Sequence, residues 1–223
     1  MPEIKRIDLM MPFKLGRVNC YLLKNDSDYI LIDTGSSNQQ AELEEALENE
    51  GCMPGNLKLI ILTHGDFDHT GNVAYLSLKF GTQVAMHIDD SGMAEYGNMF
   101  FNRKEPNILI RKIIPVLSGF GKKERFRPDL MIEGGDDLSA YGFDAEVISI
   151  PGHSRGSIGI LTANGDFFCG DLFENMDEPS LNSIMDESDT ANASIEKLTR
   201  FKIKTVYPGH GKPFLIEQFN RSN

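Results

Sequence analysis

Residues 57–72 read LKLIILTHGDFDHTGN. The first six residues form an apolar run of branched side chains, which is typical of a buried strand that ends at turn residues. Four potential metal ligands follow within six residues: His64, Asp66, Asp68 and His69. Side chains at positions 64, 66 and 68 can share one side of a turning backbone while His69 turns to another. The segment therefore predicts a loop that could feed two adjacent metal ions.

Three more candidate ligands follow expected strands in turns that contain glycine. They stand in the segments Pro151-Gly152-His153-Ser154, Cys169-Gly170-Asp171-Leu172 and Tyr207-Pro208-Gly209-His210-Gly211. Glycine allows a sharp turn directly after a strand, so the ligand stands on a rigid support, as metal catalysis requires. The fifth histidine, His87, has no such surroundings and is expected to be a hydrogen-bonded surface residue.

The rest of the chain alternates short apolar runs with helical patterns, which predicts an α/β fold with two sheets and helices outside them. Expected strands cover residues 18–23, 29–32, 57–62, 82–87, 145–150, 157–161, 166–169 and 205–207, and expected helices cover 37–50, 73–80, 106–120 and 191–201. The strands from 145 to 169 should form an antiparallel meander. Ser37 and Gln40 have capping-box spacing at the start of the first helix. We expect one domain over residues 1–223, with a helical insertion at about 89–128.

Composition excludes several functions. The chain of 223 residues has 22 Lys and Arg against 33 Asp and Glu, a formal net charge of −11 that disfavours nucleic acid as a partner. No run of 18 apolar residues occurs, which disfavours a membrane partner. Cys20, Cys52 and Cys169 are too widely spaced for a disulfide framework or a Cys-x-x-Cys zinc site. We expect a cytoplasmic protein that acts on a small molecule, with its oligomeric state left open.

The ordered ligand set resembles the metallo-β-lactamase superfamily, and the resemblance runs from Asp33 to His210. It implies a four-layer αβ/βα sandwich with a two-metal site at one edge. By this resemblance, the first metal would be held by His64, Asp66 and His153, and the second by Asp68, His69 and His210, with Asp171 bridging them. Asp33 would support the metal loop from behind. Only 13 residues follow His210, so the implied branch is glyoxalase II-like without its helical glutathione-binding domain.

Asp66 departs from the family pattern, which usually reads His-x-His-x-Asp-His. Three carboxylates, two divalent ions and a bridging hydroxide sum to a charge of about zero, whereas a histidine at 66 would make the sum about +1. One hypothesis is that Asp66 lowers the Lewis acidity of the site and shifts its preference towards iron or manganese. Another is that Asp66 weakens the first site and leaves one metal. The expected cofactors are two divalent ions, zinc first, with iron or manganese as alternatives.

The implied reaction is hydrolysis of a small ester, thioester or lactone by a metal-bound hydroxide that Asp68 and Asp171 orient as catalytic residues. No Gly-x-Ser-x-Gly nucleophile motif occurs. Two alternatives stay open: a di-iron redox or oxygen-reacting protein related to the flavodiiron core domain, and a non-catalytic metal-binding module. Arg155 is a candidate contact for an anionic substrate. Met99 and Phe100, in the insertion, are candidates for the pocket wall, although this insertion could equally cover the core.

Overall fold

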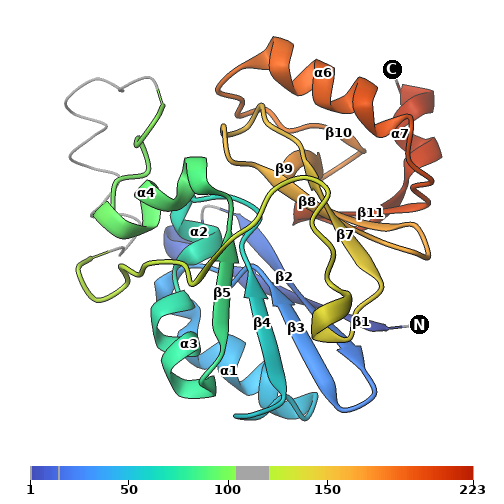
Figure 1. Ribbon diagram of the computed structural model, residues 1–223. Coiled ribbons are helices and arrows are strands. Elements are labelled where there is room, and N and C mark those ends of the chain that lie inside the picture. Colours follow the sequence, from blue (N-terminus) through green and yellow to red (C-terminus); the bar gives the residue numbers. More distant parts are fainter. Residues whose placement is uncertain (1, 15, 104–120, 223) are drawn as a thin grey trace.

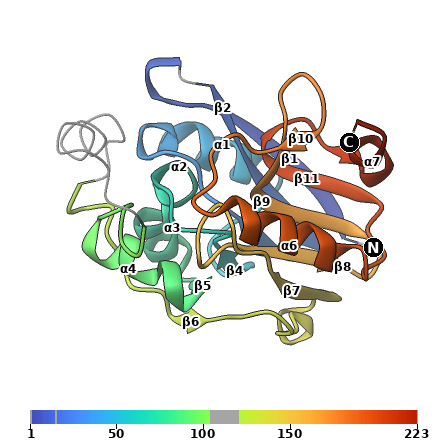
Figure 2. The same ribbon diagram turned by 90° about the horizontal axis from the view of Figure 1, so that it is seen from above.

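The computed structural model describes residues 2–14, 16–103 and 121–222. Within these residues, two six-stranded sheets pack face to face, and helices cover their outer faces (Figure 1, Figure 2). Helices α1 and α3 lie on the first sheet, and α6 lies on the second. This is the predicted four-layer αβ/βα sandwich.

The first sheet has the strand order β1-β2-β3-β4-β5-β6. Its strands are β1 (Glu3–Met10), β2 (Arg17–Asn25), β3 (Asp28–Ile32), β4 (Leu57–Ile61), β5 (Gln83–Met86) and β6 (Leu130–Met131). Strands β1 to β3 are antiparallel, and β3 to β6 are parallel. The parallel part needs crossover connections, which α1 (Gln40–Asn49) and α3 (Val73–Phe80) provide. Because β3 and β4 are parallel, their carboxyl ends, where Asp33 and the metal loop follow, lie at the same edge.

The second sheet has the order β12-β11-β9-β8-β7, with β10 paired to β9. Its strands are β7 (Ala145–Ser149), β8 (Ile158–Thr162), β9 (Asp166–Asn175), β10 (Ser180–Leu181), β11 (Thr205–Gly211) and β12 (Phe214–Leu215). The predicted meander of β7, β8 and β9 is confirmed by antiparallel pairing. Strand β11 runs parallel to β9, after a crossover through α6 (Ser188–Leu198). Helix α7 (Ile216–Ser222) ends the described chain.

Three groups of buried apolar side chains hold these layers together. One lies between the sheets and includes Ile30, Ile61 and Phe168. The other two lie between each sheet and its helices, with Leu43 of α1 in one and Leu198 of α6 in the other. Because burial of apolar area is the main favourable term in folding, these layers form a rigid support for the loops at one edge.

Several local predictions need correction. The first helix is preceded by a 3₁₀ turn, η2 (Ser37–Gln39), and its cap is Ser36, whose N–H donates to Gln39 Oε1 at 2.8 Å. The capping box therefore starts one residue before Ser37. The strand expected at 205–207 continues to Gly211, because pairing with β9 extends through a register shift.

The segment around the expected insertion contains α4 (Ile88–Tyr96), which the sequence analysis did not predict. Its hydrophobic periodicity is weak because Asp90, Ser91 and Gly92 are buried alongside Met93. His87 caps this helix by accepting a hydrogen bond from the Asp89 N–H at 3.2 Å. The helix expected at 106–120 lies outside the described residues.

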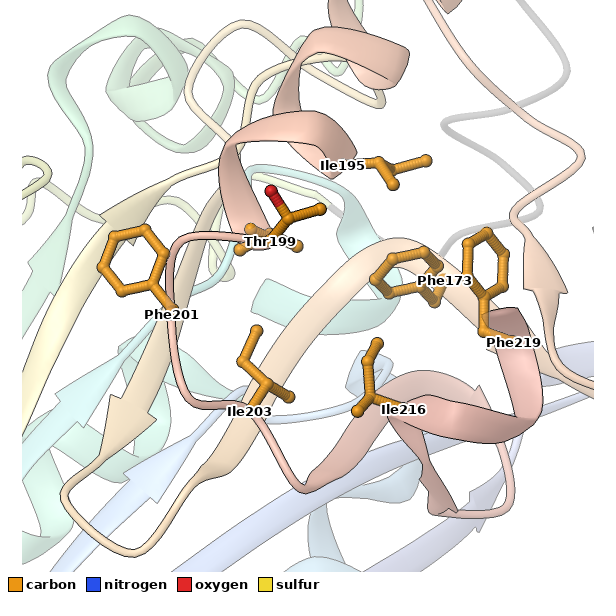
Figure 3. A pocket seen from close by; sticks show the side chains of 8 residues that line it. Phe173, Ile195, Thr199, Phe201, Ile203, Ile216 and Phe219 are labelled. Carbon is orange, nitrogen blue, oxygen red and sulfur yellow. The ribbon is translucent and has the colours of Figure 1, made fainter. Parts of the chain in front are cut away.

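A separate apolar cavity of about 220 Å³ lies between β9, α6 and α7 (Figure 3). It is lined by Phe173, Ile195, Leu198, Thr199, Phe201, Ile203, Ile216 and Phe219. Its lining offers one side-chain hydroxyl and no titratable group within the described residues, so we assign it to the packing between sheet and helices. No helix in the described part of the chain has the length and apolar character needed to cross a membrane.

Candidate metal centre

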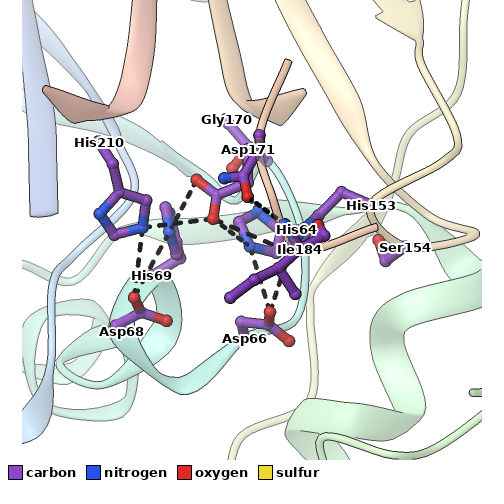
Figure 4. Close-up of polar contacts among 12 residues, drawn as sticks. His64, Asp66, Asp68, His69, His153, Ser154, Gly170, Asp171, Ile184 and His210 are labelled. Atoms are coloured by element: carbon purple, nitrogen blue, oxygen red, sulfur yellow. Dashed lines mark hydrogen bonds and ion pairs between the residues drawn. The ribbon is translucent and has the colours of Figure 1, made fainter. Parts of the chain in front are cut away.

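Seven side chains that the sequence singled out meet at one edge of the sandwich (Figure 4). They come from the loop after β4, the β7–β8 loop, β9 and β11. The set is His64, Asp66, Asp68, His69, His153, Asp171 and His210. Residues far apart in the chain thus form one cluster at the rim of both sheets.

The first group contains His64, Asp66 and His153, whose ligand atoms all lie within 4.8 Å of one another. Asp66 Oδ2 is 3.0 Å from His153 Nε2 and 3.7 Å from His64 Nε2. All three residues are buried. The geometry leaves a polar space in which one cation can meet three donor atoms.

The second group contains Asp68, His69 and His210, again within 4.8 Å. Asp68 Oδ2 is 3.9 Å from His69 Nε2 and 3.5 Å from His210 Nε2, as the dashed lines in Figure 4 show. Asp68 and His69 lie in the short helix α2 (Phe67–Thr70), whereas His210 comes from β11. This group is therefore closed only when the two sheets are packed.

Asp171, on β9, lies between the two groups. Its Oδ1 atom is 3.4 Å from His69 Nε2, and its Oδ2 atom is 3.3 Å from His210 Nε2. On the other side, Oδ2 is 4.0 Å from His64 Nε2 and 3.9 Å from His153 Nε2. One carboxylate can therefore serve both groups.

The histidine rings are oriented by the protein so that one nitrogen of each faces the centre. The Nδ1 atom of His153 is 2.7 Å from the Ile184 carbonyl oxygen, and that of His210 is 2.7 Å from the Arg17 carbonyl oxygen. Since a carbonyl only accepts, Nδ1 carries a proton in both rings, which leaves Nε2 as the atom that can bind a metal ion once the ring is neutral. This is the tautomer that metal-binding histidines use.

His64 and His69 follow the same pattern, with Nδ1 turned away from the centre. His64 Nδ1 is 2.9 Å from Thr63 Oγ1, a hydroxyl that itself donates to Asp33 Oδ2 at 2.7 Å. The hydroxyl proton is thus committed, so the Thr63 oxygen accepts from the His64 ring. His69 Nδ1 is 2.8 Å from Asp33 Oδ2.

Buried ligand atoms without hydrogen-bond partners indicate that this set of donors fits divalent metal ions. Within the described residues, His64 Nε2, His69 Nε2 and Asp171 Oδ1 are buried without a hydrogen-bond partner. Unsatisfied buried polar atoms are costly, and three of them aimed at one space fit the coordination of a metal cation. The mixed nitrogen and oxygen donors suit zinc, iron or manganese.

Asp33 makes the contacts that its predicted supporting role requires. Besides His69, it accepts from the Thr63 N–H at 2.9 Å. Its backbone has φ of 60°, a left-handed conformation in which Asp is among the more tolerant residues. The carboxylate thus ties the end of β4 to the ring of His69.

Glycine is required next to His210. A Cβ atom on Gly209 would lie 2.2 Å from Asp171 Oδ1 and 2.7 Å from His69 Cε1. Only a residue without a side chain lets β11 approach the centre so closely.

In the metal-free centre, the surroundings of each histidine shift its pKa and so decide whether it is protonated. Burial and the neighbouring His69 and His153 hold the pKa of His64 well below its usual range. Burial also opposes protonation of His210, but Asp171 and then Asp68 raise its pKa to about 9. Without metal, the carboxylates therefore retain protons on facing histidines, and bound cations would replace those protons.

The sequence analysis missed Arg103, which lies against Asp66. Its Nη1 atom is 2.5 Å from Asp66 Oδ1, and its Nε atom is 2.7 Å from Asp186 Oδ2. The Arg103 side chain is only 8% exposed. Nothing in the sequence around 103 distinguishes this arginine from a surface one, and only its burial reveals the contact.

Asp90 was also missed. It accepts from the Gly65 N–H at 2.9 Å, from Ser154 Oγ at 2.6 Å and from the Gly156 N–H at 2.9 Å. A buried aspartate with its oxygens occupied in this way links the metal loop to the loop that carries His153. Its sequence signal is a polar residue on the buried face of a helix, and this signal is visible only once helix α4 is known.

The three predicted substrate contacts lie in different places. The Arg155 side chain is 60% exposed, its Nη2 atom is 4.0 Å from Glu187 Oε1, and it does not line the pocket beside the centre. Ser154 and Gly156 on either side of it are buried, and only the Arg155 side chain is exposed to solvent. Met99 and Phe100 do line that pocket, whose volume is about 550 Å³.

Comparison with known proteins agrees with this geometry. The sequence model of the metallo-beta-lactamase superfamily matches residues 14–210, and the chain belongs to this superfamily of metal-dependent hydrolases. The predicted family and fold class are therefore confirmed. In structure, the chain is similar to the BLEG-1 B3 metallo-beta-lactamase, with a TM-score of 0.75 and 24% identity over 97% of this chain and 95% of that one.

The chain is also similar in sequence to three curated proteins. The uncharacterized protein YobT of Bacillus subtilis is 27% identical over 70% of this chain and 62% of its own length. The hydroxyacylglutathione hydrolase GloC of Haemophilus influenzae is 28% identical over 68% of this chain and 64% of its own length. The acyl-coenzyme A thioesterase MBLAC2 of Bos taurus is 25% identical over 92% of this chain and 77% of its own length. The chain thus spans less than two thirds of the first two relatives.

Proposed function

We propose that this protein is a dinuclear metal-dependent hydrolase that cleaves a small, neutral ester, thioester or lactone. The observation that carries the proposal is the convergence of four histidine Nε2 atoms and three carboxylates, with each Nδ1 atom engaged by the protein behind it. His64, Asp66 and His153 would hold one ion, Asp68, His69 and His210 the other, and Asp171 would contact both. Divalent ions would supply Lewis acidity and lower the pKa of water.

The chain's own groups then position the reacting molecules. Asp68 and Asp171 present carboxylate oxygens beside the centre, where they can accept a hydrogen bond from the attacking water and orient it. Most ligand side chains are buried, and the centre is reached through the adjoining pocket, which Asp68, Asp171 and His210 line. No serine or cysteine nucleophile is needed for this chemistry.

The pocket beside the centre favours an apolar substrate group. Its walls include Met11, Phe67, Met99, Phe100, Met176 and Ile184. The two cations among its described lining residues are already paired, Arg103 with Asp66 and Asp186, and Arg17 with Asp8 at 2.6 Å. No unpaired cation in the described lining awaits a substrate carboxylate or phosphate. The relatives GloC and MBLAC2 support thioesters as a bond type, and the pocket supports a neutral molecule.

Two thioesters with the same acyl group test the substrate class. A short apolar acyl group is placed on N-acetylcysteamine, which is neutral, and on glutathione, which is anionic. We expect kcat/KM to be at least about tenfold higher for the neutral thioester, since paired arginines cannot offset the desolvation of the anion. A preference for the glutathione thioester would contradict the neutral-substrate proposal. The same pocket should accept an apolar lactone or aryl ester.

Metal content separates this function from a redox one. Asp66 brings a third carboxylate to the centre, which favours iron as an alternative and with it oxygen chemistry. We expect mass spectrometry to find two zinc ions per chain, both in protein prepared in air and in protein prepared without air. Two irons together with oxygen consumption from an electron donor would instead support the redox function. Two bound metals with no turnover of any ester, thioester or lactone would indicate a metal-binding module.

A further inference from the structure

The two oxygens of Asp66 have different surroundings. Oδ2 faces the first ligand group, 3.0 Å from His153 Nε2 and 3.7 Å from His64 Nε2. Oδ1 faces the other way and accepts from Arg103 Nη1 at 2.5 Å. The carboxylate therefore has one oxygen free for a metal ion, and the other is engaged by a guanidinium.

Arg103 is held in place by contacts on both sides of it. On the guanidinium, Nε is 2.7 Å from Asp186 Oδ2, so the edge that carries Nη1 is turned to Asp66. On the backbone side, Asn102 Nδ2 donates to the Asp89 carbonyl at 2.9 Å, and Phe101 packs against Gly92 of α4. Since the side chain is buried, the ion pair has little competition from water.

We propose that Arg103 is a positioning residue that makes Asp66 a one-oxygen ligand of compensated charge, an electrostatic substitute for the histidine usual at this position. The inference rests on the metal-binding part of the proposed function. A neutral imidazole offers one donor atom and no charge, and Asp66 paired with Arg103 offers one donor oxygen and a net charge near zero. Asp186 shares the guanidinium through its buried Oδ2 atom, but it lies outside the ligand groups, so of these two carboxylates only Asp66 adds its charge to the metal-binding set.

The ion pair of Asp66 with Arg103 changes the sum of charges at the centre. Three carboxylates, two divalent ions and one hydroxide sum to about zero, and the buried guanidinium raises the sum to about +1, the value expected with a histidine at 66. Harder ions such as manganese gain most from charged carboxylates that can bind through two oxygens. By occupying Oδ1, Arg103 should keep the first position selective for zinc over manganese.

Competition between metals tests this directly. Full-length wild type and Arg103→Gln are dialysed against buffered mixtures of zinc and manganese, and the bound metals are counted by mass spectrometry. We expect the ratio of zinc to manganese affinity to fall about tenfold in Arg103→Gln, the low end of what partners of metal ligands contribute. Arg155→Gln, which removes an exposed arginine, is the matched control and should leave the ratio unchanged. Equal ratios in wild type and Arg103→Gln would overturn the inference.

A second pair of variants guards against a folding defect in Arg103→Gln. Asp66→His alone sets a histidine beside the guanidinium, and we expect it to bind zinc about tenfold more weakly than the double variant Asp66→His with Arg103→Gln. The double variant should bind two zinc ions and melt at a higher temperature than Asp66→His. If the single variant binds zinc as well as the double one, Arg103 does not act through Asp66.

These measurements count bound metal and do not depend on turnover. Two metals in the wild type with an unchanged metal ratio in Arg103→Gln would overturn this inference and leave the proposed function standing. The expected change of ratio without hydrolysis of any substrate would overturn the proposed function and leave the role of Arg103 standing.

Discussion

The two ligand groups of the centre are supported by groups of opposite charge. Behind the ring of His69 stands the carboxylate of Asp33, at 2.8 Å. Behind the anionic Asp66 stands the guanidinium of Arg103, at 2.5 Å. In each case, the supporting group fixes which donor atom faces the centre and adjusts its charge.

This contrast shows that a ligand and its partner are one unit. The Asp33 carboxylate makes the His69 ring a stronger donor, whereas Arg103 makes the Asp66 carboxylate a weaker one. Both supports are buried, so solvent screens neither of them strongly. A substitution at a ligand position is therefore interpretable only together with the residue behind it.

The largest effect is expected where the two groups join. Asp171→Asn removes the charge that both groups share, so we expect metal content to fall to one ion or fewer per chain. Activity should fall more than about 100-fold, beyond the effect of losing a supporting partner alone. Metal analysis and kcat/KM measure this, with Asp177→Asn, an exposed residue nearby, as the control. Two retained metals would show that the groups are independent.

Loss of the support behind His69 should weaken mainly the second group, because Asp33 contacts His69 directly and reaches His64 only through Thr63. Asp33→Asn keeps the left-handed backbone tolerable, but it removes the anion that faces the ring. We expect the affinity of one of the two metals to fall about 10-fold to 100-fold, as measured by chelator competition. Asp26→Asn is a close control, because Asp26 also has a positive φ and is exposed. A similar loss in both variants would point to backbone strain instead.

Metal binding should be coupled to proton release from the histidines of the centre. In the metal-free protein, the pKa of His210 is raised to about 9, whereas that of His64 is held below its usual range. His210 is therefore protonated at neutral pH, and the pKa of His69 in the same group is raised as well. Metal must displace these protons, so affinity for the metal of this group should fall at least about tenfold per pH unit below 9. Calorimetry in buffers of different ionisation enthalpy counts the released protons.

The same shift has an opposite consequence for the metal-free fold. A raised pKa in the folded state stabilises the protein below the unfolded value of 6.5, and this contribution is lost as the pH rises towards 9. Metal-free protein should therefore lose stability over the pH range in which metal affinity grows. His210→Gln should weaken the loss of stability towards pH 9, and an unchanged loss would assign it to His69 or His153, whose pKa values are also raised.

The smallest effect is expected at Arg155. This side chain is exposed and lies outside the pocket, so Arg155→Ala should change kcat/KM less than about twofold, as for other surface substitutions. A larger loss for an anionic substrate would restore the substrate contact that the sequence suggested. Together with a changed metal preference in Arg103→Gln, this result would show that burial decides which of the two arginines affects the centre.

Much of the fold was predictable because its signals are local. The apolar run before His64 and the helix containing Leu43 and Leu47 both carry clear periodicity, and the structure places them as expected. Helix α4 was missed because its buried face carries Asp90 and Ser91, which serve hydrogen bonds and do not add hydrophobic periodicity. The first strand, β1, was missed because only Ile7 and Leu9 of its eight residues are buried.

The sequence by itself determined the ligand types and their order, because histidines and aspartates beside glycine at strand ends form a pattern along the chain. Only the tertiary structure decided how those ligands are supported. Asp66 and Arg103 are 37 residues apart and meet through the packing of α4 against the metal loop, a contact that no local signal encodes. Burial then gives that contact its strength, because a charge pair shielded from water acts on its neighbours, whereas an exposed one such as Arg155 with Glu187 is screened.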